Sequence, residues 1–195
     1  MKLQVIVGST RPGRATLSLA KWVATEAATI EGNVVEIVDL KDFPMPFFDE
    51  AGSPRYNANR QPTPEVKAWL DKIAEGEAYV VVTPEYNHSI PGVLKNAIDY
   101  MTYEMKQKPA AIVSHGSVGG ARAATHLKEI LSEAAATIIP SGLQFVGSIT
   151  MGGIIDENGV LDETIKANPY GPQAAVTGML QDLDWHAKAL KAARA

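Results

Sequence analysis

Residues 78–100 read AYVVVTPEYNHSIPGVLKNAIDY and place a strand, a loop and a helix in immediate succession. The apolar run at 78–82 is continuous rather than alternating, as in parallel strands that are covered on both faces. Apolar residues then recur at helical spacing from 94 to 101, after Pro91, which suits the first turn of a helix. The loop between them carries a carboxylate, a phenol, an amide and an imidazole, which is more chemistry than a plain connection needs.

The rest of the chain repeats this alternation of strand and helix. Short apolar runs predict further strands at residues 3–7, 34–38, 110–113 and 143–149. Helical spacing predicts one helix with Ala20, Val23, Ala24 and Ala27 on its face, one over 121–135, and one at the end of the chain with Leu180, Leu183, Ala187 and Leu190. Together they predict an α/β fold in one domain, residues 1–195, with a doubly wound five-stranded parallel sheet and helices on both faces.

Two segments interrupt the alternation. The proline-rich segment, residues 42–64, carries five prolines, so we expect an irregular excursion there. The sequence MGGIIDENGVLDE at 151–163 predicts a small hairpin or turn around Asn158 and Gly159.

Composition excludes several classes of protein. The 195 residues carry a formal net charge of −4, which disfavours nucleic acid as a partner. Cysteine is absent, which removes disulfides, thiolate catalysis and cysteine-ligated metals, and the histidines show no ligand spacing, so we expect no metal site. The apolar stretches are too short for a signal peptide or a membrane span, so we expect a cytoplasmic protein.

The loop at residues 8–16 follows the first strand and has the features of a phosphate site. Its glycines permit tight turns, its hydroxyls and two arginines can bind an anion, and the following helix presents unpaired N–H groups. It lacks both the GK[ST] of a Walker loop and the G-x-G-x-x-G of a dinucleotide site. A ligand with a terminal phosphate monoester therefore fits this loop better than a dinucleotide does. The alternative is an ordinary turn with a capped helix and two solvated arginines.

The loop at residues 83–91 suits the polar edge of a planar heterocycle. Two prolines restrict the backbone, and the N–H and C=O groups between them are free to face a ligand. Alternatively, Asn87 and Ser89 cap the next helix and Tyr86 is a partly buried aromatic. His88 by itself indicates an exposed or packed histidine rather than a catalytic one.

The motifs GSTRPGR, residues 8–14, and PEYNHSIPGVLKNAIDY, residues 84–100, resemble the NADPH-dependent FMN reductase family. The resemblance extends over roughly residues 1–150 and implies a flavodoxin-like fold that binds FMN. It implies three groups of cofactor-binding residues: Ser9, Arg11, Arg14, Thr16 and Leu17 around the phosphate; Pro84, Glu85, Tyr86 and Asn87 along the pyrimidine side of the flavin; and Ser117, Gly119 and Gly120, from SHGSVGGAR, completing the ring site.

The resemblance also implies an activity. Hydride passes from NADPH or NADH through FMN to a small acceptor such as a flavin, quinone, azo compound or metal oxyanion, and no catalytic side chain is required. Arg14 could instead contact a 2′-phosphate of the nicotinamide nucleotide. Members are typically homodimers or homotetramers. The apolar residues of the proline-rich segment (Phe43, Met45, Phe47 and Phe48) then either cover a neighbour's flavin or pack on their own domain.

Three other functions are open at this stage. One is an FMN electron carrier of the flavodoxin kind, and another is a regulatory FMN-binding module without turnover. The third is a serine hydrolase, in which HGSVGG would present Ser117 as nucleophile and His186 as its partner, although His115 occupies a position that a nucleophile elbow keeps small. The sequence does not indicate the acceptor, the choice between NADPH and NADH, or the choice between dimer and tetramer.

Overall fold

The computed structural model describes residues 1–149 and 151–194. It contains a five-stranded sheet with the order β2-β1-β3-β4-β5, in which every neighbouring pair is parallel. The strands are β1 (Lys2–Val7), β2 (Val34–Asp39), β3 (Ala78–Pro84), β4 (Pro109–Gly116) and β5 (Thr137–Val146). This order and direction confirm the predicted doubly wound α/β fold.

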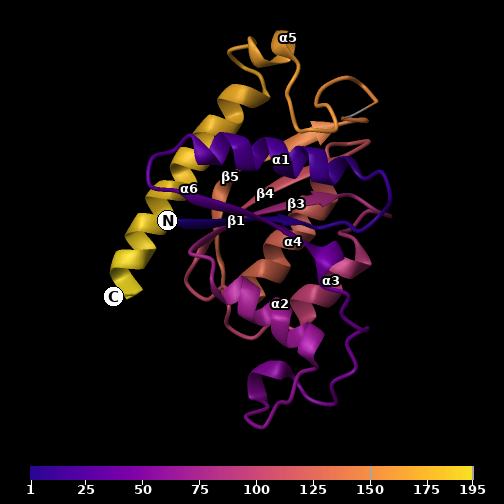
Figure 1. Ribbon diagram of the computed structural model, residues 1–195, viewed down its shortest axis with the longest axis vertical. Helices are drawn as coiled ribbons and strands as arrows, with labels where there is room; N and C mark the ends of the chain where they lie inside the picture. The colour runs from indigo at the N-terminus through magenta and orange to yellow at the C-terminus, as the bar shows by residue number, and fades with distance from the viewer. Residues whose placement is uncertain (150, 195) are drawn as a thin grey trace.

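Helices cover both faces of the sheet (Figure 1). They are α1 (Ala15–Ala28), α2 (Pro64–Ala74), α3 (Gly92–Asp99), α4 (Ala121–Glu133), α5 (Glu163–Lys166) and α6 (Pro172–Arg194), with short 3₁₀ turns η1 (Leu40–Asp42) and η2 (Pro54–Tyr56). One core lies between the sheet and α1 with α6, and a second lies between the sheet and α2, α3 and α4. Adjacent residues of a strand point to opposite faces. Val5 and Val7 therefore enter the first core and Ile6 enters the second.

The last strand differs from its prediction. It begins at Thr137 rather than 143 and ends at Val146 rather than 149. The first half of the strand was not predicted because it contains Pro140 and Gly142, and both residue types are disfavoured inside strands. β5 is an edge strand and its pairing with β4 is irregular between Ala110 and Ile112, which is where such residues are tolerated.

Helix α2 was missed by the sequence analysis. Its signals are a Thr63 hydroxyl that accepts from the Val66 N–H at 3.5 Å, a proline at the first helical position, and buried residues at helical spacing. The indole of Trp69 donates to the carbonyl of Ala97 at 2.8 Å and fixes α2 against α3. Pro64 is the last proline of the proline-rich segment, and there it begins a helix rather than preventing one.

The proline-rich segment is irregular up to α2 and folds back onto the chain. Three of its four apolar residues, Phe43, Met45 and Phe48, pack against the second core, whereas the side chain of Phe47 remains 86% exposed. Asn96 of α3 holds this region by accepting from the Phe48 N–H at 2.8 Å and donating to the Pro46 carbonyl at 2.8 Å. The alternative of packing on its own domain therefore holds for three of the four residues.

The turn predicted around Asn158 and Gly159 is confirmed by an antiparallel bridge between Ile155 and Leu161. Gly159 has φ +84° and lies against α1, where a Cβ atom would approach the Trp22 nitrogen to 2.8 Å and the Ser18 carbonyl oxygen to 2.9 Å. Both the backbone conformation and this close approach require glycine.

We expect Gly159→Ala to lower the free energy of unfolding by about 2 kcal/mol more than Gly153→Ala does, as measured by urea denaturation. Gly153 has φ +69°, and a Cβ atom added there would meet nothing within 4 Å, so its substitution carries only the conformational cost. Equal losses for the two variants would show that the turn does not press on α1.

Candidate functional site

Three loops meet at the carboxyl edge of the sheet. Because β1, β3 and β4 are adjacent and parallel, Val7 lies level with Val82, and Pro84 lies level with His115. The loops that follow these strands, residues 8–14, 85–91 and 117–120, therefore open on the same side. In doubly wound sheets ligands bind at this edge.

The first loop ends at the uncapped positive end of a long helix. Arg14 occupies the N-cap position of α1 without a capping hydrogen bond from its side chain, and the first turn holds no acidic residue. In the described part of the chain the N–H groups of Ala15 and Thr16 have no hydrogen-bond partner. An uncapped helix start with unpaired donors is a site for an anion.

The two arginines of this loop are placed differently. Arg14 forms an ion pair with Asp39 at the end of β2, and its side chain is only 7% exposed. Its Nε is buried and has no partner among the described residues. Arg11 is exposed and its guanidinium lies 5.3 Å from the ring centre of Tyr86. Arg11 is therefore free to meet an incoming anion, whereas Arg14 is fixed beside the helix start.

The second loop is a tight turn. Tyr86 and Ser89 exchange backbone hydrogen bonds of 2.9 and 3.0 Å, and the residues between them, Asn87 and His88, have φ of +49° and +67°. Helix α3 starts later, with Pro91 at its N-cap position and no capping side chain. The alternative in which Asn87 and Ser89 cap this helix is therefore wrong.

Tyr86 joins the second loop to the first. Its hydroxyl lies 2.9 Å from the hydroxyl of Ser9, a buried residue, while Arg11 lies against its ring. The two sequence motifs thus form one continuous surface. Pro84 is buried at the end of β3, and Asn87 is exposed at the tip of the turn.

The third loop winds tightly between β4 and α4. Gly119 and Gly120 have φ of +75° and +71°, and a Cβ atom on Gly120 would lie 2.8 Å from the nitrogen of His115. The Ser114 hydroxyl donates to the Gly119 carbonyl at 2.8 Å. Ser117 is exposed at the outer bend, and its N–H has no partner in residues 1–149 and 151–194. This loop can present backbone donors to a flat ligand.

Glu85 has a side-chain role that the sequence analysis did not find. Its carboxylate accepts from the backbone N–H of Arg122 at 3.0 Å and from the guanidinium of Arg122 at 2.7 Å, so it caps α4 from another loop. Burial raises the pKa of Glu85, but these hydrogen bonds and one from the Ala123 N–H outweigh it and leave the pKa below its ordinary value. The positive end of α4 is thus already balanced by a carboxylate, unlike that of α1.

His115 and Thr16 form a second contact that sequence reasoning missed. The Nε2 atom of His115, at the end of β4, lies 2.9 Å from the Thr16 hydroxyl in the first turn of α1. Burial lowers the pKa of His115 from 6.5 to about 4, so the imidazole is neutral near pH 7. Only the parallel pairing of β1, β3 and β4 brings these residues together, since 99 positions separate them in the chain.

The geometry does not support a serine hydrolase. Nδ1 of His186 lies 3.1 Å from a carboxylate oxygen of Asp182, and Asp182 accepts from Ser141 near the middle of β5. Ser117 instead follows the end of β4, and the neighbouring His115 faces Thr16. Neither histidine is paired with Ser117.

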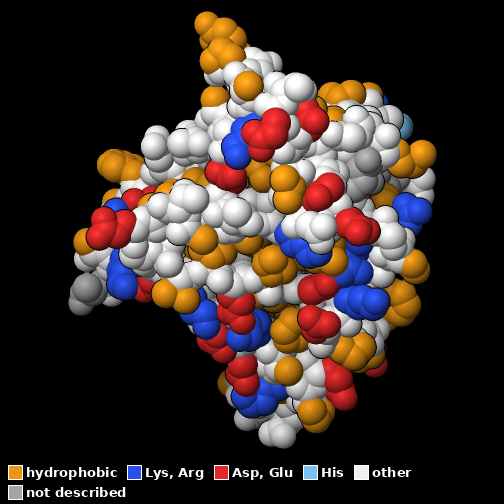
Figure 2. All heavy atoms as spheres, turned by 45° about the horizontal axis from the view of Figure 1, so that its top comes forward, with side chains coloured by type: hydrophobic (Ala, Val, Ile, Leu, Met, Phe, Trp, Pro, Cys, Tyr) orange, Lys and Arg blue, Asp and Glu red, His pale blue; other side chains and the backbone are white. Residues whose placement is uncertain are grey.

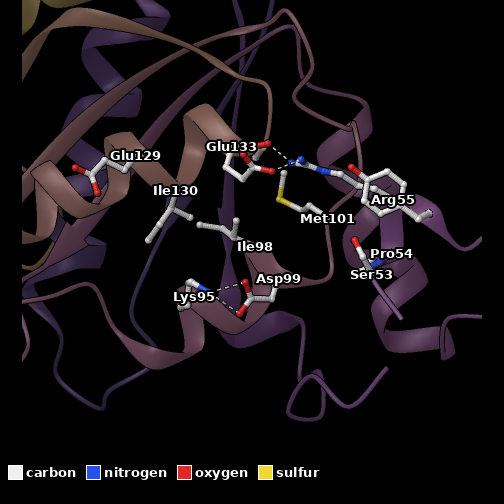
Figure 3. Close-up of a pocket in the computed structure, with 12 residues that line it drawn as sticks. Ser53, Pro54, Arg55, Lys95, Ile98, Asp99, Met101, Glu129, Ile130 and Glu133 are labelled. Carbon is white, nitrogen blue, oxygen red and sulfur yellow. Dashed lines mark hydrogen bonds and ion pairs between the residues drawn. The ribbon is translucent and has the colours of Figure 1, made fainter. Parts of the chain in front are cut away.

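A separate pocket of about 430 Å³ lies away from these loops, between η2, α3 and α4 (Figure 3). Arg55 spans one side of it, donating to Glu133 at 2.6 Å and to the Thr102 carbonyl at 3.2 Å. These bonds attach the proline-rich segment to the end of α4 and to the chain just after α3. The lining includes none of the predicted cofactor-binding residues, so this pocket is not part of the candidate site.

Comparison with known proteins identifies the family. Residues 1–150 match the family model described as NADPH-dependent FMN reductase. The chain belongs to this family. An NAD(P)H-dependent FMN reductase of Schizosaccharomyces pombe is 39% identical over 129 residues, which cover 66% of this chain and 64% of the relative. A quinone reductase of Escherichia coli is 33% identical over 173 residues, which cover 83% of this chain and 87% of the relative.

A solved structure agrees with this family assignment. The flavoenzyme FerB of Paracoccus denitrificans, an NAD(P)H:acceptor oxidoreductase, superposes with a TM-score of 0.71 and 26% identity. The match covers 96% of this chain and 97% of FerB, and so includes α6, which lies beyond the residues that the FMN reductase family model matches.

The surface shown in Figure 2 mixes both signs of charge. Lysine and arginine side chains alternate with aspartate and glutamate there, and apolar side chains are scattered among them. Among the described residues, no helix has the length and apolar character needed to cross a membrane.

We expect the free energy of unfolding to decrease between pH 6.5 and pH 4 in part because of His115. In the unfolded chain the His115 imidazole binds a proton near pH 6.5, whereas in the native protein burial prevents protonation until about pH 4. Lowering the pH across this range therefore lowers the free energy of unfolding by about 3 kcal/mol. Urea denaturation at several pH values should show a flatter profile for His115→Gln. A profile as steep as that of the unmodified chain would contradict the burial of a neutral imidazole.

For Glu85→Gln we expect a loss of about 1–2 kcal/mol at pH 7, because the cap of α4 loses its charge. Glu129→Gln on the exposed side of the same helix is the control and should change stability little. Because the native pKa of Glu85 is lowered, the difference between Glu85→Gln and the unmodified chain should shrink as pH falls through and below 4.5. A difference that is constant with pH would mean that the charge of Glu85 does not cap the helix.

Proposed function

We propose that this protein is an FMN-dependent NAD(P)H oxidoreductase that passes hydride from NADPH or NADH, through bound FMN, to a small acceptor. The observation that carries the proposal is the uncapped, acid-free start of α1 with the orphaned Nε of Arg14 beside it. The unpaired N–H groups at the start of this 14-residue helix and the buried Nε–H of Arg14 are hydrogen-bond donors that suit a phosphate dianion. The family's use of FMN supports that assignment.

The predicted binding residues divide between the two ends of the cofactor. In this proposal the phosphate lies at the start of α1, held by Ser9, Arg11, Thr16, the Nε of Arg14 and the N–H of Leu17, which also makes a long hydrogen bond of 3.4 Å to the Arg14 carbonyl. The ring lies between the second and third loops, along residues 84–87 and against Ser117, Gly119 and Gly120. Tyr86 touches Ser9 and Arg11, so it connects the phosphate end to the ring end.

When bound, FMN supplies the hydride acceptor and donor, so the protein does not need a nucleophile or a general acid. The chain's own part is to hold the ring and to leave one face accessible. In this proposal the N–H of Ser117, an exposed residue whose N–H has no partner among the described residues, would face negative charge on the ring edge. The start of α4 contributes less, because Glu85 already accepts from its first N–H groups.

The quinone reductase of E. coli among the relatives favours a quinone as one acceptor class, and the open loops suit other flat acceptors as well. We further propose a homodimer or homotetramer in the cytoplasm. Of the four apolar residues Phe43, Met45, Phe47 and Phe48, it is Phe47 whose exposed side chain is still available to a neighbouring subunit.

The decisive experiment is an absorbance spectrum of the protein after loading with FMN and desalting, followed by anaerobic addition of NADPH or NADH. We expect retained flavin bands that bleach with the reduced nucleotide. Bands that stay unbleached with both nucleotides would favour an electron carrier or a regulatory module, and no retained flavin would contradict the FMN site itself.

The phosphate assignment has its own test. Arg11→Ala should weaken FMN binding about tenfold and leave riboflavin, which lacks the phosphate, nearly unchanged, as measured by fluorescence titration. Lys67→Ala, which removes an exposed cation on α2, is the matched control. Equal weakening for FMN and riboflavin would show that Arg11 does not meet the phosphate.

A further inference from the structure

The contact between His115 and Thr16 spans the sheet edge beneath the proposed phosphate site. The Thr16 side chain is 1% exposed, and its hydroxyl lies 2.9 Å from Nε2 of His115. Thr16 is the second residue of α1, in the first turn, where the N–H groups of Ala15 and Thr16 have no partner among the described residues. A hydroxyl buried at that position can make one bond to the imidazole and one to a ligand at the helix start.

The side chains of His115 and Thr16 together have only two hydrogens that can be donated in hydrogen bonds. A neutral imidazole has a single N–H, and a hydroxyl has a single hydrogen. If Nε2 carries the proton, it donates to the Thr16 oxygen, and the hydroxyl hydrogen is free to point elsewhere. If Nδ1 carries it, Nε2 accepts the hydroxyl hydrogen, and Thr16 presents only lone pairs to the site. Lone pairs would repel a phosphate oxygen, so an anion at the start of α1 selects the first arrangement.

We propose that His115 is a positioning residue for the cofactor phosphate: its Nε2–H donates to the Thr16 oxygen and so directs the Thr16 hydroxyl hydrogen toward the phosphate of FMN. This inference rests on the proposed function. It adds a specific role to His115, which is not among the cofactor-binding residues that the resemblance implied. The low pKa of His115 agrees with it, because the imidazole keeps a single proton throughout the neutral range.

A purely structural role for the contact predicts something different. If His115 and Thr16 only fix α1 against β4, their loss would disturb the whole site and weaken FMN and riboflavin alike. If they serve the phosphate, the loss falls on FMN alone. The ratio of the two dissociation constants therefore separates the two roles.

The test uses four single variants, one double variant and two ligands in fluorescence titrations. His115→Leu removes the donor, His115→Gln restores an N–H near the place of Nε2, and His115→Asn restores one near Nδ1 instead. Thr16→Val removes the hydroxyl at nearly constant shape. Thermal unfolding of each variant checks that it is folded, and the Gln and Asn pair remains informative if the Leu variant does not fold.

We expect His115→Leu, His115→Asn and Thr16→Val each to weaken FMN binding about tenfold, with riboflavin binding changed less than twofold. His115→Gln should keep most of the affinity for FMN. The double variant His115→Leu/Thr16→Val should be no weaker than Thr16→Val alone, because the imidazole acts through the hydroxyl. Equal losses for both ligands, or failure of Gln to exceed Asn, would overturn the proposal.

A ¹⁵N-labelled sample gives an independent readout. With FMN bound, the histidine side-chain spectrum should show the proton of His115 on Nε2, and the signal should change in Thr16→Val. A proton on Nδ1 in the FMN complex would overturn the assignment. If the unmodified protein binds neither FMN nor riboflavin, it is the proposed function that fails, whereas normal FMN binding by the His115→Leu variant contradicts this inference alone.

Discussion

The arrangement of the site depends on one backbone hydrogen bond, from the Glu85 N–H to the His115 carbonyl at 2.9 Å. It continues the ladder between β3 and β4 just past the pairing of Pro84 with His115. Because the register is fixed there, the carboxylate of Glu85 reaches the start of α4 and the imidazole of His115 reaches the first turn of α1. Tyr86 follows Glu85 directly and contacts Ser9. The register of β3 on β4 therefore positions all three loops relative to one another.

The two helices that begin at this edge differ in electrostatics. The start of α4 is compensated from within the protein by the carboxylate of Glu85. The start of α1 has no acidic residue and no side-chain cap, and Asp39 nearby is engaged by Arg14. The partial positive charge at the start of α1 is not compensated within the protein, whereas that at the start of α4 is. An anion is therefore bound more favourably at α1 than at α4. This difference supports the proposal that the phosphate binds at the start of α1 and that the third loop contacts the ring.

The stability of the edge comes from packing below it rather than from the loops. Val7, Val82 and Val113 lie level with one another in β1, β3 and β4 and are fully buried, and their packing holds this edge of the sheet in place. The strand-forming runs could be recognised from sequence because a strand covered on both faces needs apolar residues throughout. Helix α2 and the first half of β5 were missed because proline and glycine have a meaning that depends on position. Pro64 begins a helix, and Pro140 lies in an edge strand, where a missing N–H is tolerated.

The sequence alone determined the fold class and the positions of the three loops of the candidate site, since hydrophobic periodicity and loop chemistry are local properties of the chain. It also indicated the family through the two motifs at residues 8–14 and 84–100. Only the tertiary structure decided the partners of Glu85 and His115, because those contacts depend on which strands are adjacent and in which register they pair. Arg14 illustrates the same limit: it lies in the predicted phosphate loop, yet its pairing with Asp39 follows from the position of β2 beside β1. Local pattern fixes which chemistry is available, and the order of the strands fixes which groups meet.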